Sequence, residues 1–563
     1  MNKKWEYKET NTVLSNEISK KHNISKTLAE ILVNRNIIKD EDIRVFLNPT
    51  RNDFYDPYLL PDMEKAVNRI ITARANEEKI IIYGDYDVDG ITSIAVLKKF
   101  LNDIGIHAEH YIPNRLEEGY GLNKNAIDEI VKSKINLMIT VDCGISGIDE
   151  VEYANSFGLE TIITDHHEPL ETLPDAIAII DPKIKSSIYP FSQLAGVGVV
   201  FKLIQAISKK LELDDREYLK YLDLVCIGTI SDIVPLVDEN RVIAKLGLKL
   251  VEQTKDVGLR TLIEYSGYKK INSSAISFGV APRINACGRM GHADEALKLF
   301  LTEDKKEAIN LTEELNEYNK KRQEIEKRIY NEALEKINKE GIENKSIIVV
   351  EGDNWHHGVI GIVSSKITES YFKPSILVCF EGDEGKGSGR SIPGFDLHSA
   401  LCNSSDYLEK YGGHSMAIGL SLKKNNFNNF KEAIEKYTDE SNIKSIVPIV
   451  NIDKLLCNDD LKIDLIKELE LLEPFGEGNK CPLFAYKNLK IDSIRTLTEG
   501  RHLKLTLKTE NNNFITAIGF NMGNREEQFI IGNRIDIVGI LEVNSFNGID
   551  SIQFNLKDIM KSL

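Results

Sequence analysis

The sequence of 563 residues lacks the features of a secreted or membrane protein. No segment approaches the ~18 consecutive apolar residues that a membrane-spanning helix needs. The seven cysteines lie far apart, none with C-x-x-C spacing, and their odd number argues against a disulfide framework. The amino terminus, MNKKWEYKET, has no apolar stretch after its lysines, which argues against a secretory signal. We therefore expect a cytoplasmic protein with no membrane partner.

The sequence also contains fewer basic than acidic residues. Lys and Arg number 71 against 87 Asp and Glu, which gives a formal net charge of −16. Such a total disfavours a nucleic-acid partner, but binding to a strand depends on a local patch rather than on the sum. Residues 480–525 contain eight Lys or Arg and three Asp or Glu, a local balance of +5. The acidic total therefore does not exclude a nucleic acid.

The length and the residue pattern predict several domains. At about 150 residues per domain, the chain has room for three or four. From Lys79 to about residue 300, near-continuous apolar strands alternate with helical segments, which indicates a parallel sheet covered on both faces. Residues 303–340 contain no proline or glycine, and their apolar positions recur at helical spacing. This pattern predicts one long, largely solvated helix that connects two domains.

A second strand–helix alternation follows this helix and ends in the glycine-rich sequence GDEGKGSGRS. From about residue 450, short strand-like segments at even spacing, among them LKIDSIRTL, HLKLTLKT, NFITAIGF and RIDIVGILEV, predict a small β-barrel. The predicted fold class is therefore α/β, with two α/β lobes joined by a long helix and a carboxy-terminal barrel. The predicted segments are 1–70 (helical and irregular), 71–302, 303–340, 341–447 and 448–563.

Acidic residues and histidines follow successive apolar segments of the first α/β block. In a doubly wound sheet, ligands bind beyond the carboxyl ends of the strands, so residues at equivalent ends meet at one edge. Carboxylate oxygens with a few imidazoles suit Mn²⁺ or Mg²⁺, whereas Zn²⁺ sites usually draw on Cys or several His. We therefore predict a metal site at this edge. The segments and their residues are KIIIYG with Asp85, Asp87 and Asp89; INLMITV with Asp142; LETIIT with Asp165, His166 and His167; and LDLVCIGTIS with Asp232.

Each of these motifs has another interpretation. The pattern D-x-D-x-D-G also begins an EF-hand calcium loop, but loop position 12 is Val96 rather than the bidentate Glu that such a loop needs. An Asp at a strand end is often only a turn residue or a helix cap, and for Asp142 alone this alternative stays open. The adjacent histidines could be one buried and one solvated side chain. Four acidic clusters at equivalent strand ends are, however, hard to explain as four unrelated turns.

These motifs, in this order, resemble those of the DHH phosphoesterase superfamily. Asp87 and Asp89, VDCG, TDHH and SDIVPL are the residues that carry this resemblance. Further segments resemble one member, the RecJ family of single-stranded-DNA exonucleases, and the match covers nearly the whole chain. These segments are IPNRLEEGYGL (112–122), AGVGV (195–199), APRINACGRMG (281–291), GSGRSIPGFDL (387–397), YGGH (411–414) and LEPFGEGN (472–479).

The resemblance implies a hydrolase that acts on single-stranded DNA in the 5′→3′ direction and releases 5′ mononucleotides, in DNA repair and recombination. Two divalent ions, Mn²⁺ or Mg²⁺, would be shared by five ligands, with Asp142 as the bridge between them. His167 would contact the scissile phosphate, and Asp85 would support catalysis from outside the ligand set. The implied ligands are Asp87, Asp89, Asp142, His166 and Asp232.

The resemblance also implies substrate contacts in the first lobe. Arg115 and Arg283 match phosphate-binding positions of the family, and guanidinium groups suit a terminal phosphate because they can bind it bidentately. Tyr120 is a candidate stacking surface for a base, although an aromatic residue between glycines is as often a packing residue.

In the second lobe, which corresponds to the DHH-associated domain of the family, Arg390 in GKGSGRS and His414 in YGGH would contact the substrate. The glycines of GKGSGRS would let the backbone approach phosphates, as in anion nests; a flexible turn is the alternative. The role of His356 and His357 stays open.

The resemblance further implies that the barrel is an OB-fold, a fold that often binds single strands by a basic groove and by stacking. A single-strand-binding protein and a RecQ-type helicase are partners implied by the family alone. Other members of the superfamily cleave oligoribonucleotides or cyclic dinucleotides, and RecJ-like chains can serve as non-catalytic replication scaffolds. A scaffold predicts eroded metal ligands, whereas every metal-motif position is intact here. The candidates for the basic face are Lys487, Lys490, Arg495, Arg501, Lys504 and Lys508.

Overall fold

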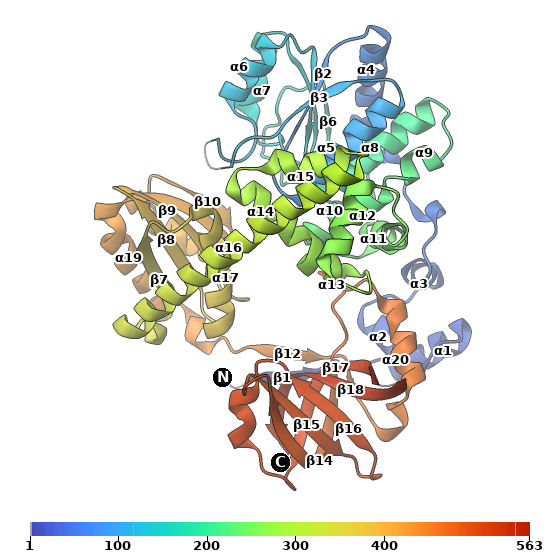
Figure 1. The fold of residues 1–563 in the computed structure, drawn as a ribbon, viewed down its shortest axis with the longest axis vertical. Helices are drawn as coiled ribbons and strands as arrows, with labels where there is room; N and C mark the ends of the chain where they lie inside the picture. Colours follow the sequence, from blue (N-terminus) through green and yellow to red (C-terminus); the bar gives the residue numbers. More distant parts are fainter. Residues whose placement is uncertain (1–2, 116–117, 547, 563) are drawn as a thin grey trace.

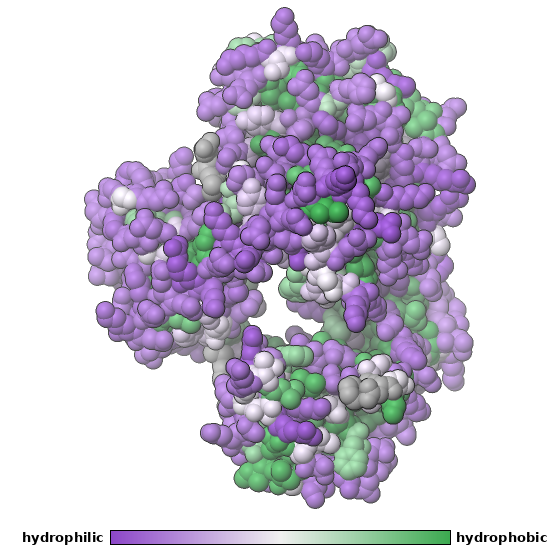
Figure 2. Space-filling model, viewed as in Figure 1, coloured by the Kyte–Doolittle hydropathy of each residue, from purple (hydrophilic) through white to green (hydrophobic). Residues whose placement is uncertain are grey.

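The computed structural model describes residues 3–115, 118–546 and 548–562. It contains two α/β lobes and a barrel unit, arranged around a central opening (Figure 1). The opening is also present in the space-filling view, so side chains do not fill it (Figure 2). No helix among the described residues is both long and apolar enough to cross a membrane.

The first α/β lobe is built on a five-stranded parallel sheet with the strand order β3-β2-β4-β5-β6. Every residue of β2 and β4 is buried, as expected for strands covered on both faces. Because all five strands run in the same direction, their carboxyl ends lie at one edge. The strands are β2 (Ile80–Gly84), β3 (Ala108–Tyr111), β4 (Leu137–Val141), β5 (Glu160–Thr164) and β6 (Ala178–Ile180).

Helices make up the rest of this lobe. The prediction that strands and helices alternate to about residue 300 is wrong, because the described chain between β6 and β7 (Ile348–Asp353) contains helices and loops but no strand. The apolar segment before Asp232 is the buried helix α10 (Leu222–Ser231) and not a strand. A short run that is apolar on all sides cannot be assigned by periodicity alone. The main core helices are α5 (Val88–Asp103), α8 (Gly196–Lys210), α10, α11 (Asp238–Val251) and α14 (Ala281–Met290).

The connecting helix is confirmed as α16 (Lys305–Glu340). Its start is capped by the side chain of Asp304, and it ends at Gly341, which adopts the left-handed backbone with φ 67°. Leu311 and Leu315 pack into the core of the first lobe, and Ile329 and Ile337 into a core of the second. One end of α16 is therefore packed in the core of the first lobe and the other in a core of the second, so the helix is a rigid connection between them and not a flexible linker.

The second α/β lobe has a mixed five-stranded sheet with the order β10-β11-β9-β8-β7. The glycine-rich sequence GDEGKGSGRS is neither a nest nor a flexible turn, as the sequence suggested, because most of it forms the antiparallel strand β9. Its glycines lie close to neighbouring side chains, and a β-carbon on Gly387 would be 2.7 Å from Leu420. The other elements are β8 (Ser375–Glu381), β9 (Glu384–Arg390), β10 (Lys410–His414), β11 (Ala417–Lys423), α17 (His357–Tyr371) and α19 (Phe427–Glu440).

The predicted barrel is confirmed, with the strand order β13-β14-β15-β16-β18-β17. An additional pairing between β14 and β17 joins the two sides of the sheet. All four segments singled out in the sequence form strands. The strands are β13 (Lys454–Leu455), β14 (Phe484–Leu497), β15 (His502–Lys508), β16 (Phe514–Gly519), β17 (Arg534–Phe546) and β18 (Ile549–Lys561).

The amino-terminal helices belong to the barrel unit, which the sequence did not reveal. The short strand β1 (Lys4–Tyr7) pairs in parallel with β12 (Ile449–Ile452). Apolar side chains of the first three helices share one core with the barrel and with α20 (Ile463–Leu469). Figure 1 shows α1 and α2 beside α20, above the barrel, with α3 between them and the first lobe. The helices are α1 (Thr12–His22), α2 (Lys26–Asn34) and α3 (Asp40–Leu47).

Candidate metal and nucleic-acid site

Three parallel strands carry acidic residues and histidines to one edge of the first sheet, as predicted. β2 leads into Asp85, β4 into Asp142 and β5 into Asp165. Asp87 is the cap of α5, and its carboxylate accepts hydrogen bonds from the backbone N–H groups of Asp89 and Gly90 at 2.9 and 3.1 Å. A cap at this point directs the following turn of α5 toward the site.

The motif AGVGV, at the start of α8, contacts the carboxylates of Asp89 and Asp142. The backbone N–H groups of Gly196 and Val197, at the start of α8, donate to the two oxygens of Asp89 at 2.7 and 2.9 Å. A β-carbon on Gly196 would lie 2.7 Å from Oδ1 of Asp142. Glycine is therefore required at 196, because it lets the helix start approach both acidic side chains.

His166 lies at the centre of the carboxylates. Its Nε2 is 3.1 Å from Asp142, 3.7 Å from Asp232 and 3.9 Å from Asp89. Asp232 reaches this point from the end of helix α10, so its convergence with the others is confirmed although its predicted position at a strand end is wrong. All predicted ligands are thus brought together.

The unpaired polar atoms of this cluster fit divalent cations. Nε2 of His166 and Oδ1 of Asp85 are buried and have no hydrogen-bond partner among the described residues. Ligand atoms lie within 4.8 Å of one another in three groups, two of which share His166 and two of which share Asp142. Buried acidic groups without a counter-charge are costly, and oxygen-rich donors with one imidazole suit Mn²⁺ or Mg²⁺. The groups are Asp85, Asp87 and Asp142; Asp89, His166 and Asp232; and Asp142, His166 and His167.

Burial and mutual repulsion perturb the ionisation of these side chains. Burial, with the charges of neighbouring carboxylates, raises the pKa of Asp89 to about 7 and that of Asp232 to about 9. The same causes raise the pKa of Asp142 well above its ordinary value. Burial and the neighbouring His167 lower the pKa of His166 to about 3, so its imidazole is neutral and able to bind a metal.

We expect Mn²⁺ binding to release protons near neutral pH, because Asp89 and Asp232 are partly protonated in the metal-free protein. Their pKa values are raised by folding, so their contribution favours the fold below about pH 4 and is lost as the pH rises toward about 9. Thermal unfolding in EDTA should therefore shift to lower temperature across this range, and Mn²⁺ should reduce the shift. Calorimetry in buffers of different ionisation enthalpy counts the protons; an enthalpy that is independent of the buffer would contradict the prediction.

His167 is held by Asp165. The buried Oδ1 of Asp165 accepts hydrogen bonds from the backbone N–H groups of His166 and His167 and is 2.7 Å from Nδ1 of His167. Burial alone would lower the pKa of His167, but the hydrogen bond and charge of Asp165 raise it to about 9. His167 is therefore an imidazolium at neutral pH and can donate a charged hydrogen bond toward the cluster.

Tyr120 contacts His167 rather than standing free as a stacking surface. Its hydroxyl is 3.2 Å from the carbonyl oxygen of Asp142 and donates to it. The hydroxyl oxygen of Tyr120 also lies 3.2 and 3.3 Å from the two ring nitrogens of His167. Because it is almost equally far from both nitrogens, it is in line with neither N–H. The ring is still 49% exposed. Stacking on a base stays a prediction, and the contacts indicate that Tyr120 also restrains the His167 ring.

Three arginines, Arg115, Arg289 and Arg390, lie close enough to interact with one another, and two of them interact with the carboxylates of Asp85 or Asp87. The guanidinium of Arg115 lies 5.0 Å above the ring of Tyr86, and Arg390 ends strand β9 of the second lobe. Arg289 of α14 donates to the carbonyl of Gly358 at 2.9 Å, which links the two lobes. Burial, with the positive charges of Arg115, Arg322 and Arg390, lowers the pKa of Arg289 to about 10. These guanidinium groups are close enough to repel one another. Such a concentration of positive charge is expected where an anion binds.

Arg283 is not part of this group. Its guanidinium donates to the side chain of Asn316 at 2.5 Å and to the carbonyl oxygens of Gly279 and Tyr265, so it packs α14 against neighbouring helices. Arg289, six residues further along the same motif, was not predicted from the sequence. The arginine was visible in APRINACGRMG, but a helical position that faces the second lobe cannot be distinguished from one that packs within the first lobe without the neighbouring helices.

The second lobe brings further imidazoles near the cations. The rings of His356 and His357 stack with centroids 5.7 Å apart, and burial together with Arg115 and other positive charges lowers the pKa of both. His414 lies exposed at the end of β10, the edge strand of the second sheet. Its role as a substrate contact stays a prediction.

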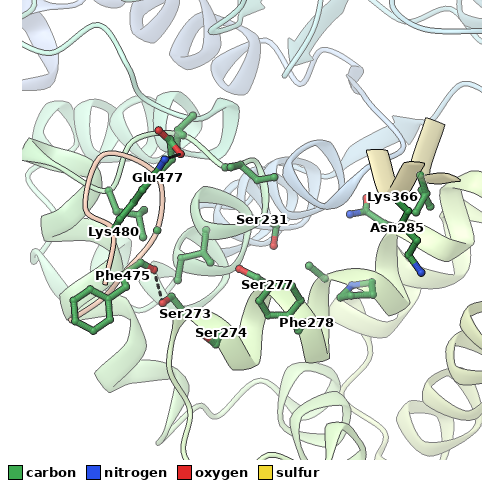
Figure 3. A pocket seen from close by; sticks show the side chains of 18 of the residues that line it. Ser231, Ser273, Ser274, Ser277, Phe278, Asn285, Lys366, Phe475, Glu477 and Lys480 are labelled. Carbon is green, nitrogen blue, oxygen red and sulfur yellow. Dashed lines mark hydrogen bonds and ion pairs between the residues drawn. The ribbon is translucent and has the colours of Figure 1, made fainter. Parts of the chain in front are cut away.

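A cavity of about 820 Å³ lies beside Asp232, between the first lobe, α16, α17 and the segment that leads into the barrel (Figure 3). Its wall includes Ser231, Ile233, Phe278 and Arg289. Two of these side chains, Ile233 and Phe278, are apolar and largely exposed. This hollow has apolar, polar and cationic walls, and it adjoins the residues on either side of Asp232.

The barrel carries part of the predicted basic face in an ordered array. Lys490 is paired with Lys508, and Arg495 with Lys504, across the antiparallel ladder of β14 and β15. Neighbouring like charges on one ladder repel each other, so their concentration there favours an anionic partner. Lys487 instead lies over the ring of Tyr7 at 5.1 Å.

Comparisons with known proteins agree with this division of the chain. The DHH family N-terminal domain matches residues 79–229, the DHHA1 domain residues 344–440 and the RecJ OB domain residues 452–558. The single-stranded-DNA-specific exonuclease RecJ of Bacillus subtilis is 37% identical over 561 residues, which cover 99% of this chain and 70% of that protein.

Solved structures give the same result. The crystal structure of RecJ from Thermus thermophilus in complex with Mn²⁺ has a TM-score of 0.87 and 31% identity, over 100% of this chain and 80% of that chain. The structure of RecJ from the same organism in complex with Mg²⁺ has a TM-score of 0.81 and 29% identity, over 100% of this chain and 79% of that chain. The similarity therefore extends across both lobes and the barrel unit.

Proposed function

Because the chain belongs to the RecJ family, we propose that it is a metal-dependent exonuclease that hydrolyses single-stranded DNA from a 5′ end and releases 5′ mononucleotides. The observation that carries the proposal is the convergence of the carboxylates on the unpaired Nε2 of His166. The related proteins are named single-stranded-DNA-specific exonucleases, and a related structure holds Mn²⁺. Action in DNA repair and recombination follows from the family.

We assign the metal site to two divalent cations, Mn²⁺ or Mg²⁺. When bound, such a pair supplies an activated water and neutralises charge on the phosphate. Asp142 belongs to two of the three ligand groups, which suits a shared anion between two cations. Asp85 is also in one group, so it is a candidate ligand as well as a support. The proposed ligands are Asp87, Asp89, Asp142, His166 and Asp232.

The protein's own residues would then act on the substrate from two sides. His167, held by Asp165, donates a charged hydrogen bond to the scissile phosphate and stabilises the negative charge that develops on it. Arg115, Arg289 and Arg390 lie where the two lobes meet and would hold a terminal 5′ phosphate. Fixing that phosphate places the first phosphodiester bond against the carboxylate cluster, which accounts for the release of mononucleotides.

Labelled DNA tests the polarity. A single strand carrying a 5′ phosphate and a label at either end is incubated with Mn²⁺ or Mg²⁺, and duplex DNA of the same sequence serves as the control. We expect labelled mononucleotides to appear first from the 5′ label and the duplex to persist. Early release from the 3′ label would contradict the proposed direction.

Arg289 and Arg283 provide a matched pair of variants in one helix. We expect Arg289→Met to weaken binding of a 5′-phosphorylated oligonucleotide by about tenfold or more, because a charged hydrogen bond contributes about 1.5–3 kcal/mol. Binding of the same oligonucleotide with a 5′ hydroxyl should change much less. Arg283→Met should lower the melting temperature and leave the preference for phosphate intact. A loss of phosphate preference in Arg283→Met alone would reverse the two assignments.

The predicted partners rest on different kinds of support. Single-stranded DNA is the substrate that the related proteins' names support. A single-strand-binding protein and a RecQ-type helicase stay predictions from the family resemblance, as does the cytoplasmic location. A non-catalytic scaffold is disfavoured because the metal-binding cluster is complete.

A further inference from the structure

The segment 472–479, LEPFGEGN, has no part in the function proposed so far, although it lies near the metal ligands. It comes from the barrel side of the chain and lies against residues 233–237, the loop that directly follows Asp232. Figure 3 shows Phe475 and Glu477 on this segment, at the wall of the cavity beside Asp232. We call residues 472–479 the docking segment and residues 232–237 the ligand loop.

Backbone contacts join the docking segment to the first lobe. The N–H of Leu236 in the ligand loop donates to the carbonyl of Glu477 at 2.8 Å. The hydroxyl of Ser273 donates to the carbonyl of Phe475 at 2.6 Å, shown as a dashed line in Figure 3. A β-carbon on Gly478 would lie 3.0 Å from Cβ of Pro235. A side chain at residue 478 would therefore press on the ligand loop, in addition to the strain of the left-handed backbone there.

The docking segment is itself held rigidly. Arg241 of α11 is 1% exposed, and its guanidinium donates to the carbonyl oxygens of residues 471–474 at 3.0–3.4 Å and to that of Phe46 at 2.8 Å. The side-chain amide of Asn479 donates to the carbonyls of Leu472 and Pro474 at 2.9 and 2.8 Å. A buried guanidinium that donates to backbone carbonyls therefore serves to fix this segment.

The ligand loop contains a strained residue next to the metal ligand. Ile233 has φ 63°, in the left-handed region that a β-branched residue seldom adopts. Its side chain is 71% exposed, so its own burial does not compensate the strain. Such a conformation persists only where neighbouring structure imposes it, and the docking segment makes backbone contact with the loop three residues later.

We propose that the docking segment is a positioning element for Asp232. It holds the ligand loop in the strained conformation that points the Asp232 carboxylate at His166, and it thereby couples the barrel unit to the metal site. The inference rests on the metal-binding role of Asp232 in the proposed function. Removing the contact lets Ile233 relax to an ordinary backbone conformation, which turns Asp232 away from the other ligands.

The test compares two glycines that both adopt the left-handed backbone. Gly478 has φ 70° and contacts the ligand loop, whereas Gly532, with φ 91°, has no described atom within 4 Å of its β-carbon position. We expect Gly478→Ala to weaken Mn²⁺ binding to the DNA-free protein about tenfold, as is typical when a group that orients a metal ligand is lost. Gly532→Ala should bind Mn²⁺ as the parent does. Calorimetric titration measures both.

A rescue variant separates positioning from general damage. Asn tolerates the left-handed backbone far better than Ile, so Ile233→Asn in the Gly478→Ala background should restore part of the Mn²⁺ affinity. If Gly478→Ala does not fold, Gly476→Ala replaces it, because its β-carbon would meet the flexible side chain of Leu236, at 2.7 Å, rather than backbone.

The outcomes are distinct. Unchanged Mn²⁺ affinity in the folded docking-segment variant, equal loss in Gly532→Ala, or no rescue by Ile233→Asn would each overturn the positioning role. Asp232→Ala is the reference: if it binds Mn²⁺ like the parent protein, the metal assignment in the proposed function fails, whatever the docking segment does.

Discussion

Replacing Asp142 by alanine is expected to abolish nuclease activity while the protein stays folded. The carboxylate belongs to two ligand groups and lies 3.1 Å from Nε2 of His166, so its loss removes the anion that two cations would share. Cations of this kind contribute several kcal/mol of charge stabilisation in the transition state, which corresponds to a loss of about a thousandfold or more in rate. The rate of mononucleotide release from 5′-phosphorylated single strands measures the effect.

Asparagine at the same position is the matched control. Asp142 has φ 58°, so alanine adds backbone strain that asparagine largely avoids. Both variants should be inactive, because both lose the negative charge, but Asp142→Asn should keep a melting temperature closer to that of the parent in EDTA. Near-parent activity in either variant would refute the two-metal assignment.

The second large effect is expected for His167→Ala. Its imidazolium is fixed by Asp165 at 2.7 Å and faces the ligand cluster. Removing a single preorganised donor to a developing negative charge typically costs about 10²–10³-fold in rate. We therefore expect single-turnover cleavage to slow by that factor, with DNA binding almost unchanged.

The Mn²⁺ isotherm separates this role from metal binding. His167→Ala should bind Mn²⁺ nearly as the parent protein does, whereas His166→Ala should lose much of its affinity because its unpaired Nε2 lies among the carboxylates. Comparable loss of metal in both variants would make His167 a ligand.

Much of the fold was predictable because its signals are local. The apolar strands β2, β4 and β5, each followed by acidic residues, needed only the rule that parallel strands end at one edge. Helix α16 followed from a long stretch free of glycine and proline. The segment before Asp232 was wrongly predicted to be a strand. A helix that is buried along nearly its whole length has no polar face, so its sequence shows no helical periodicity.

Other features depend on contacts between distant parts of the chain. The packing of α1–α3 against the barrel joins residues more than 400 positions apart, and no local pattern encodes it. Within the site, the ligand types were readable from their motifs, but the orientation of side chains was not. Arg283 and Arg289 lie in the same helix, and only the surrounding helices decide that the first packs against Asn316 and the second contacts Gly358 of the second lobe.

The amino-terminal segment has a topological effect. From the first lobe the chain passes along α16 to the second lobe, then through β12 into the barrel; α1–α3, held in the barrel core, lead back through residues 48–62 to the first lobe. The polypeptide thus forms a closed circuit around the opening of Figure 1, with a non-covalent closure at the barrel core. A polymer lying through that opening can leave only past one of its ends or after the closure dissociates. A covalently circular strand cannot be threaded there while the closure holds.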